Sequence, residues 1–246
     1  MKLWGSSDIG VVRQENQDTY MLHELEDGAL LVVCDGMGGA KGGSTASSTA
    51  SHAFAEAVEQ GYQKNMKPSE MADLVALAAT KANAAVYQAA RQDPSLSGMG
   101  TTVTLLWEDG KRVLVGHVGD SRAYRLRGGE LKQITQDHSI VAELLRNNVI
   151  TAEMARNHPY RNVITRAVGV DPVVTPDVID EDKQPDDVWL VCSDGLYNMV
   201  SDDVIRDTGS ETDEQAADSL LSLALENGGS DNITFVICRV TEVDGQ

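Results

Sequence analysis

Short apolar runs separated by turn residues dominate the chain. Residues 29–34 read Ala-Leu-Leu-Val-Val-Cys, and residues 188–192 form a second continuous apolar run. Runs of this length, bounded by Gly and Asp, favour strands buried on both faces. Two hairpins are indicated, one across Asp109-Gly110 and one across Gly128-Gly129. The expected strands are 3–7, 29–34, 101–107, 112–118, 122–126, 130–133, 173–179, 188–192 and 234–239.

Longer segments carry helical spacing. Ser69 follows a proline and suits the cap of a helix that runs to about Gln92. An Ala-rich helix from about Ser44 to Gln60 is expected after a Gly-rich bend at 36–43. The other expected helices are 139–147, 151–157 and 212–226. Because strands do not alternate singly with helices, the pattern predicts an α+β layered sandwich of antiparallel sheets.

Composition narrows the classes of function. The formal net charge is −18 and the pI is about 4.5, so no basic footprint for nucleic acid is visible. The sequence contains no run of 18 or more apolar residues, so no membrane span is expected. The first residues also lack the apolar core of a signal peptide. We therefore expect a cytoplasmic protein that binds neither nucleic acid nor membrane. With no linker or break in composition, residues 1–246 are expected to form a single domain.

Two further groups of residues have simple expected roles. Cys34, Cys192 and Cys238 lie in strand-like runs without Cys-x-x-Cys spacing, so buried thiols are expected rather than a zinc site or disulfides. The acidic residues of 180–182 and 186–187 surround Pro185 and are expected in a solvated loop.

Aspartates recur at strand ends. Asp35 ends the run 30–34, Asp120 follows the run 113–118, and Asp194 follows the run 188–192, each beside a glycine. Asp231 precedes the strand 234–239. Ends and starts of antiparallel strands share a rim, so these carboxylates can converge. Clustered carboxylates repel one another unless they are protonated or bind metal, and oxygen ligands suit Mg²⁺, Mn²⁺ or Ca²⁺. The simpler alternative is that each Asp-Gly pair makes a tight turn.

The Gly-rich segment 36–43 fits neither of two common binding loops. Lys41 precedes the final glycines, which is the wrong order for a nucleotide-binding phosphate loop. The residues after Asp35 also lack the alternating oxygen ligands of a calcium-binding EF-hand.

Five motifs occur in a recognisable order along the chain. They are Arg13…Asn16-Gln17-Asp18, Asp35-Gly36-Met37-Gly38-Gly39, Gly119-Asp120-Ser121-Arg122, Ser193-Asp194-Gly195 and Asp231-Asn232. This set resembles the metal-dependent type 2C (PPM family) protein serine/threonine phosphatases, in their bacterial single-domain branch. The match runs from Ser7 to Arg239. It implies a four-layer α-β-β-α sandwich, two antiparallel sheets flanked by helices, with a flap at about 138–165.

The resemblance also implies a role for each motif. Asp35 would bridge two metals, Mn²⁺ or Mg²⁺, and the Gly36 carbonyl would bind the second. Asp194 and Asp231 would hold the first metal, and Asp120 with Asp194 a third, weaker one. Arg13 would clamp the substrate phosphate and, with Asp35, carry the catalysis. Three further residues are expected to support these ligands without binding the metals themselves, namely Gln17, Asp18 and Asn232.

Two positions depart from the family pattern. Gln17 stands where many relatives carry Glu, so a group next to metal-bound water is neutral in this chain. Met37 stands where some relatives have a histidine proposed as the general acid, which leaves the proton donor open. Of the five histidines, none stands out as its substitute, and His117 has the simplest interpretation of an ordinary strand residue.

The expected function is hydrolysis of phosphoserine and phosphothreonine monoesters in proteins by a metal-bridged hydroxide. Its expected partners are phosphorylated proteins, a Ser/Thr kinase that it opposes, and that kinase's substrates, with the phosphatase acting as a monomer. Two alternatives stay open. One is a catalytically inactive relative that docks phosphoproteins, and the other is a two-metal phosphodiesterase or nuclease, which the charge of −18 disfavours.

Overall fold

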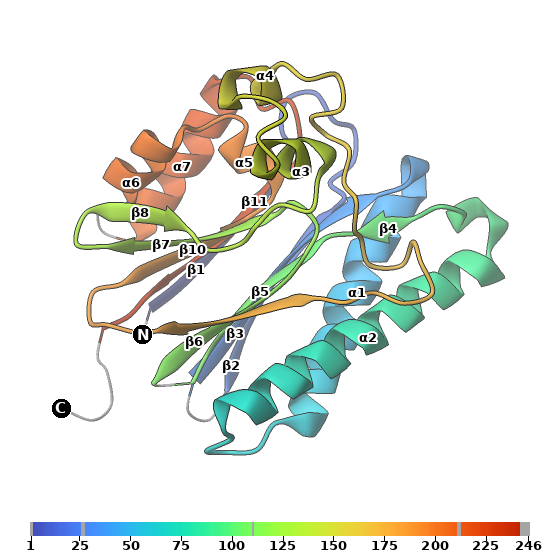
Figure 1. The fold of residues 1–246 in the computed structure, drawn as a ribbon, viewed down its shortest axis with the longest axis horizontal. Coiled ribbons are helices and arrows are strands. Elements are labelled where there is room, and N and C mark those ends of the chain that lie inside the picture. Colours follow the sequence, from blue (N-terminus) through green and yellow to red (C-terminus); the bar gives the residue numbers. More distant parts are fainter. Residues whose placement is uncertain (1, 26–27, 110, 211–212, 242–246) are drawn as a thin grey trace.

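The computed structural model describes residues 2–25, 28–109, 111–210 and 213–241. Figure 1 shows two stacked sheets between two layers of helices. One sheet has the order β1-β11-β10-β7-β8, and the other has the order β2-β3-β5-β6-β9 with β4 beside β3. Every strand pairing is antiparallel. The α+β class and the four layers expected from the sequence are confirmed.

The strands of the first sheet are β1 (Lys2–Asp8), β11 (Ile233–Arg239), β10 (Val188–Cys192), β7 (Arg122–Arg127) and β8 (Glu130–Gln133). Those of the second are β2 (Asp18–Leu25), β3 (Gly28–Met37), β5 (Val103–Glu108), β6 (Arg112–Val118) and β9 (Asp177–Asp182), with β4 (Gly100–Thr101). The helices α1 (Gly39–Gly61) and α2 (Pro68–Gln92), followed by the 3₁₀ turn η1 (Pro94–Leu96), cover the second sheet. The helices over the first sheet are α5 (Asp194–Tyr197), α6 (Asp202–Gly209) and α7 (Asp213–Glu226).

Strand β3 explains why the central runs are apolar throughout. Its alternate residues Leu30, Val32 and Cys34 pack in the cluster beneath α1 and α2. Leu31 and Val33 point the other way, into the cluster between the two sheets. A strand with a packed layer on each face has no polar side. A third cluster lies between the first sheet and its helices, so each pair of adjacent layers encloses a core.

Several element boundaries differ from those expected. Helix α1 begins at Gly39 rather than Ser44. The glycines at its start pack closely on β3, since a Cβ on Gly43 would lie 2.8 Å from the Gly36 carbonyl oxygen. The strand expected at 173–179 begins only at Asp177. Strand β2 and helix α6 were not expected from the sequence, which is mixed in polarity in β2 and only eight residues long and mostly polar in α6. The expected helix 212–226 starts at Asp213, and Thr212 lies outside the described residues.

The expectation of a solvated acidic loop at 180–187 is wrong. Residues 180–182 belong to β9, and Glu181 pairs with Arg125 of β7 at 2.7 Å. Arg127 pairs with both Asp182 and the fully buried Asp187. The arginines of the first sheet thus neutralise acids from the second sheet and its following turn. A pattern of charge in one strand does not reveal which strand of another sheet will lie beside it.

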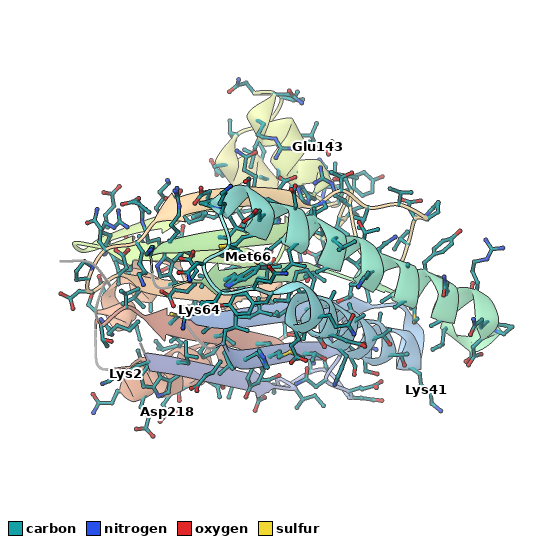
Figure 2. All side chains as sticks on the ribbon, turned by 90° about the horizontal axis from the view of Figure 1, so that it is seen from below. Lys2, Lys41, Lys64, Met66, Glu143 and Asp218 are labelled. Carbon is teal, nitrogen blue, oxygen red and sulfur yellow. The ribbon has the colours of Figure 1, made fainter. Side chains whose placement is uncertain are left out.

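The segment expected as a flap contains α3 (Ile140–Arg146) and α4 (Ala152–Arg156). These short helices stand at one end of the sandwich in Figure 1, and the segment around Glu143 projects from the body in Figure 2. A β-bridge between Ser139 and Ile164 closes its base. The three cysteines are buried and free, as expected. Among the described residues, no helix has both the length and the apolar character needed to cross a membrane.

Candidate active site

A cleft of about 700 Å³ gathers residues from distant parts of the sequence. Four aspartates line it, namely Asp35, Asp120, Asp194 and Asp231, together with Arg13 and Gly36. Every residue expected to bind metal or phosphate is therefore in this one cleft. The flap also contributes to the wall, through Asn162 and Ile164, which the sequence did not single out.

The sheet ends bring the four aspartates together. Asp35 lies near the end of β3, Asp120 follows β6, Asp194 opens α5 just after β10, and Asp231 precedes β11. Strands β10 and β11 are antiparallel neighbours with Cys192 opposite Phe235, so the end of one lies beside the start of the other. Convergence at a shared rim, the basis of the sequence prediction, is what the pairing produces.

The backbone of Asp35 is held by two adjacent threonines. The Asp35 N–H donates to Thr102 Oγ1 at 2.9 Å, and the Asp35 carbonyl accepts from Thr101 Oγ1 and the Thr102 N–H, both at 2.9 Å. Thr102 Oγ1 also lies 2.7 Å from Ser121 Oγ. Sequence analysis missed this support, although a Thr-Thr pair opening a buried strand was a visible signal.

Gly36 has no room for a side chain. A Cβ there would lie 2.1 Å from the Gly43 carbonyl oxygen and 2.5 Å from that of Gln17. The glycine lets the end of β3, the loop before β2 and the first turn of α1 approach one another. This close approach places Gly36 in the cleft wall beside Asp35.

The residues expected to support the ligands hold neighbouring segments together. Asp18 Oδ2 accepts from the Ser193 hydroxyl at 2.7 Å, which ties β2 to the residue before Asp194. Gln17 Nε2 donates to the Gly39 carbonyl at 2.9 Å. Asn232 Nδ2 donates to the carbonyls of Ile9 and Glu15 at 2.9 and 3.0 Å. Asn232 thereby anchors both sides of the loop that carries Arg13.

Arg13 faces the aspartates across the cleft. Its Nη2 donates to Asp231 Oδ2 at 2.6 Å, and its side chain remains 53 % exposed. This hydrogen bond raises the pKa of Arg13, and the carboxylates of Asp194 and Asp35 act in the same direction. The guanidinium thus stays charged and partly open to a ligand in the cleft.

The carboxylates of the cleft are poorly solvated. Burial raises the pKa of Asp120 to about 7, with Asp194 adding repulsion, and burial with repulsion from Asp231 raises that of Asp194 to about 6. Burial likewise raises the pKa of Asp18 to about 7 and that of Asp35 well above its ordinary value. Such a cluster is relieved by protonation or by a cation.

The donor set fits hard divalent cations. No group of three or more His, Cys, Asp or Glu side chains among the described residues is already gathered into a compact ligand set. The carboxylates nevertheless share one cleft and repel each other, and Arg13 occupies an oxygen of Asp231. Side-chain rotation alone can bring carboxylates that share a cleft to ligand spacing. The described residues that line the cleft offer carboxylates and a backbone carbonyl without thiolate or imidazole, a set that suits Mg²⁺ or Mn²⁺.

The raised pKa values predict a pH-dependent stability of the metal-free protein. In the unfolded chain Asp120 has an ordinary pKa of about 3.9, and in the fold its pKa is about 7. The folded state therefore holds this proton more tightly, and the carboxyl destabilises it increasingly as pH rises through that window. In chelator, Asp120→Asn should raise the thermal midpoint more at pH 8 than at pH 5. An equal shift at both pH values in thermal unfolding would contradict the prediction.

Histidine is absent from the described residues that line the cleft. His117 and His138 are instead buried together, with ring centroids 4.7 Å apart. Burial lowers the pKa of His117 to about 4 and also lowers that of His138. His117 is thus more than the ordinary strand residue expected, and the pairing was invisible in the sequence because 20 residues of chain separate the two rings.

Comparisons with known proteins agree with this geometry. The family model described as protein phosphatase 2C matches residues 10–226. The serine/threonine protein phosphatase PstP of Mycobacterium tuberculosis is 38 % identical over 97 % of this chain, which spans only 45 % of that relative's length. The serine/threonine phosphatase stp of Listeria monocytogenes is 34 % identical, over 94 % of this chain and 92 % of the relative.

Solved structures share the whole fold. A crystal structure of a bacterial serine phosphatase superposes with a TM-score of 0.91 at 33 % identity and covers both chains completely. The catalytic domain of a PstP phosphatase, solved in complex with two manganese ions, gives a TM-score of 0.85 at 34 % identity over 98 % of each chain. The motifs, the two-sheet sandwich and the carboxylate cleft all have the same explanation: this chain belongs to the protein phosphatase 2C family.

Proposed function

We propose that the protein hydrolyses phosphoserine and phosphothreonine monoesters of other proteins, with Mn²⁺ or Mg²⁺ as cofactor. The observation that carries this proposal is one cleft that gathers four aspartates, three of them with pKa values raised by burial, beside a half-exposed arginine. Its family membership and the serine/threonine phosphatases among its relatives support the same reaction. Divalent cation dependence is supported by the related catalytic domain in complex with two manganese ions.

Each cleft residue has a proposed part in holding the cations. Asp35 would bridge two of them, the Gly36 carbonyl would bind one, and Asp194 with Asp231 would bind the other. Asp120, together with Asp194, would bind a third and weaker one. Bound there, the cations would activate water and offset negative charge on the phosphoryl oxygens.

Arg13 would bind the phosphoryl group of the substrate. Its planar guanidinium can donate two parallel hydrogen bonds to phosphate oxygens. The present partner, Asp231, is also a proposed cation ligand, and a cation there would compete with Arg13 for that carboxylate. The arginine would then be released toward the incoming phosphate, which would couple cation binding to substrate binding.

A cysteine-based mechanism is disfavoured. Burial raises the pKa of Cys192 and Cys238 to about 12, and raises that of Cys34 as well. None of the three therefore forms the thiolate that a nucleophile requires. Direct attack of water on phosphorus, without a phosphoenzyme, is the mechanism that these residues support.

We further propose that the substrates are phosphoproteins of a bacterial Ser/Thr kinase and that the protein acts in the cytoplasm as a monomer. The three free cysteines accord with a reducing compartment. The alternative of an inactive docking module is disfavoured, since such a module has no need of four mutually repelling carboxylates in one cleft. The nuclease alternative is disfavoured by the charge of −18.

A substrate panel tests the proposal. The purified protein is given phosphothreonine, phosphoserine and phosphotyrosine peptides and a bis-nitrophenyl phosphate diester, each with Mn²⁺ or Mg²⁺. Rapid hydrolysis of the first two, with little turnover of the diester, is expected. Absence of all hydrolysis would favour the docking module, and preferential cleavage of the diester would favour the nuclease.

Replacement of Arg13 should act mainly on substrate binding. A lost charge-assisted contact costs about 1.5–3 kcal/mol, or roughly 10–150-fold in affinity. Because Arg13 is half exposed, we expect Arg13→Ala to raise the KM for phosphopeptide toward the lower end of that range. Arg13→Lys, which keeps the charge but not the fork, should fall between. Unchanged KM and kcat in Arg13→Ala would show that Arg13 is only a surface residue.

A further inference from the structure

The turn that presents Asp120 is held by His138. The Gly119 N–H donates to His138 Nδ1 at 3.0 Å, and the His138 N–H donates to the Gly119 carbonyl at 2.7 Å. Gly119 has a φ of +113°, and a Cβ there would lie 2.5 Å from Thr102 Cγ2. The residue before Asp120 is therefore fixed by conformation, by packing and by two hydrogen bonds to a single partner.

The hydrogen bonds define the state of the His138 ring. Nδ1 accepts from Gly119, so it carries no proton, and Nε2 lies 3.1 Å from Asp177 Oδ2, to which it donates. Asp177 Oδ1 in turn accepts from Arg166 at 2.7 Å. His138 is only 5 % exposed. A neutral ring with its proton on Nε2 satisfies both neighbours, and Asp177 fixes that tautomer.

Asp120 is held from its other side by Tyr197. The Tyr197 hydroxyl donates to the Asp120 carbonyl at 3.1 Å. The Arg122 guanidinium stacks on the Tyr197 ring at 3.7 Å and pairs with Asp137, the neighbour of His138 in the chain. Segment 137–138 and α5 thus restrain the backbone on both sides of the Asp120 side chain.

The same histidine connects this turn to the flap. Its carbonyl accepts from the Thr165 N–H at 2.8 Å, and the next residue, Ser139, pairs with Ile164 in a β-bridge. Ile164 lines the cleft. His138 therefore lies between the Asp120 turn and the two segments that meet at the flap base, around Ser139 and Ile164.

We propose that His138 is a positioning residue, whose Nδ1 fixes the Gly119 amide so that the Asp120 carboxylate faces the cleft and the flap base keeps its place relative to it. It is distinct from a catalytic residue, because it is not among the described residues that line the cleft. The inference rests on the proposed function, in which Asp120 is a cation ligand. It adds a determinant of the reaction that lies outside the cleft.

Two near-isosteric variants separate the two ring nitrogens. In His138→Asn the amide oxygen can take the place of Nδ1 and accept from Gly119, whereas the donor to Asp177 is lost. In His138→Gln the amide reaches the place of Nε2, and the acceptor for Gly119 is lost. His52→Ala, which changes an exposed histidine on α1, is the matched control. The readouts are exchange of the Gly119 amide hydrogen, thermal stability, Mn²⁺ binding by calorimetry, and kcat and KM on phosphothreonine peptide.

In His138→Gln, the Gly119 amide hydrogen is expected to exchange faster than in the wild type. The kcat should fall about 2- to 12-fold, which corresponds to the loss of one hydrogen bond. The affinity for the most weakly bound Mn²⁺ should fall by a similar factor. The KM should stay within about 2-fold, since the substrate contact by Arg13 is untouched. His138→Asn should retain most of both properties, and Tyr197→Phe should weaken the same Mn²⁺ step from the other side.

Equal losses in the Asn and Gln variants, or a fall in kcat with the Gly119 amide still protected, would overturn the proposal. So would a loss of thermal stability in both variants without any change in Mn²⁺ binding, which would mean a merely structural role. If the wild-type protein hydrolysed no phosphopeptide, the proposed function would fail. The amide exchange and Mn²⁺ calorimetry would still decide whether His138 positions Asp120.

Discussion

Asp35→Asn is expected to reduce kcat on phosphothreonine peptide by about 1000-fold or more. Asp35 is the buried carboxylate proposed to contact two cations, so its loss removes several kcal/mol of stabilisation from the transition state, at about 1.36 kcal/mol per decade of rate. The backbone bonds to Thr101 and Thr102 do not involve its side chain. The variant should therefore fold, and the loss should be in catalysis.

Thermal unfolding provides the internal check. Burial and neighbouring carboxylates raise the pKa of Asp35, so a neutral amide relieves repulsion in the metal-free protein. Asp35→Asn should be at least as stable as the wild type in chelator at pH 8. Asp203→Asn, on the exposed surface of α6, should keep full activity. Activity of Asp35→Asn within 10-fold of wild type would remove Asp35 from the proposed mechanism.

Removal of divalent cations is expected to abolish activity and to lower stability together. Among the described residues, Arg13 is the only cationic side chain that forms an ion pair with one of the four aspartates, so most of their charge is left for a cation to neutralise. Protein stripped with chelator should lose more than about 99 % of its turnover, as expected where cations activate the water. Mn²⁺ or Mg²⁺ should restore it and raise the thermal midpoint by mass action.

The two readouts of this experiment constrain each other. The rise in thermal midpoint should shrink in Asp35→Asn, because that variant lacks the bridging ligand, and should persist in Asp203→Asn. Full turnover by stripped protein in excess chelator would refute a cation mechanism. Restored turnover without any change in thermal midpoint would mean that the cation acts on the substrate and not on the cleft.

The chain covers different shares of its relatives' lengths. The chain spans 45 % of the M. tuberculosis relative but 92 % of the Listeria relative. Both relatives match nearly the whole of this chain, over 97 % and 94 % of its length. Asn162 and Ile164, which lie in the expected flap and line the cleft, are the natural first sites of mutagenesis for substrate choice.

The sequence alone determined the fold class and the identity of the cleft residues. Local hydrophobic runs and Asp-Gly turns report strands and their ends, because burial and turn chemistry act over a few residues. The five motifs then identified Arg13, Gly36 and the four aspartates, all of which line one cleft. The carboxylates repel each other in any fold that brings them together, so the hypothesis that they bind cations could be drawn from the sequence alone.

Only the tertiary structure decided how those residues are held. The Thr102 hydroxyl beneath Asp35, the Ser193 hydroxyl on Asp18 and the His138 ring on Gly119 are contacts between segments 19 to 175 residues apart. The ion pairs between the acidic residues of β9 and the arginines of the other sheet also join segments that are far apart in the sequence. Hydrogen bonds and ion pairs act over about 3 Å. Strand order and register across the two sheets decide which side chains come that close. No local pattern in the chain encodes that order and register.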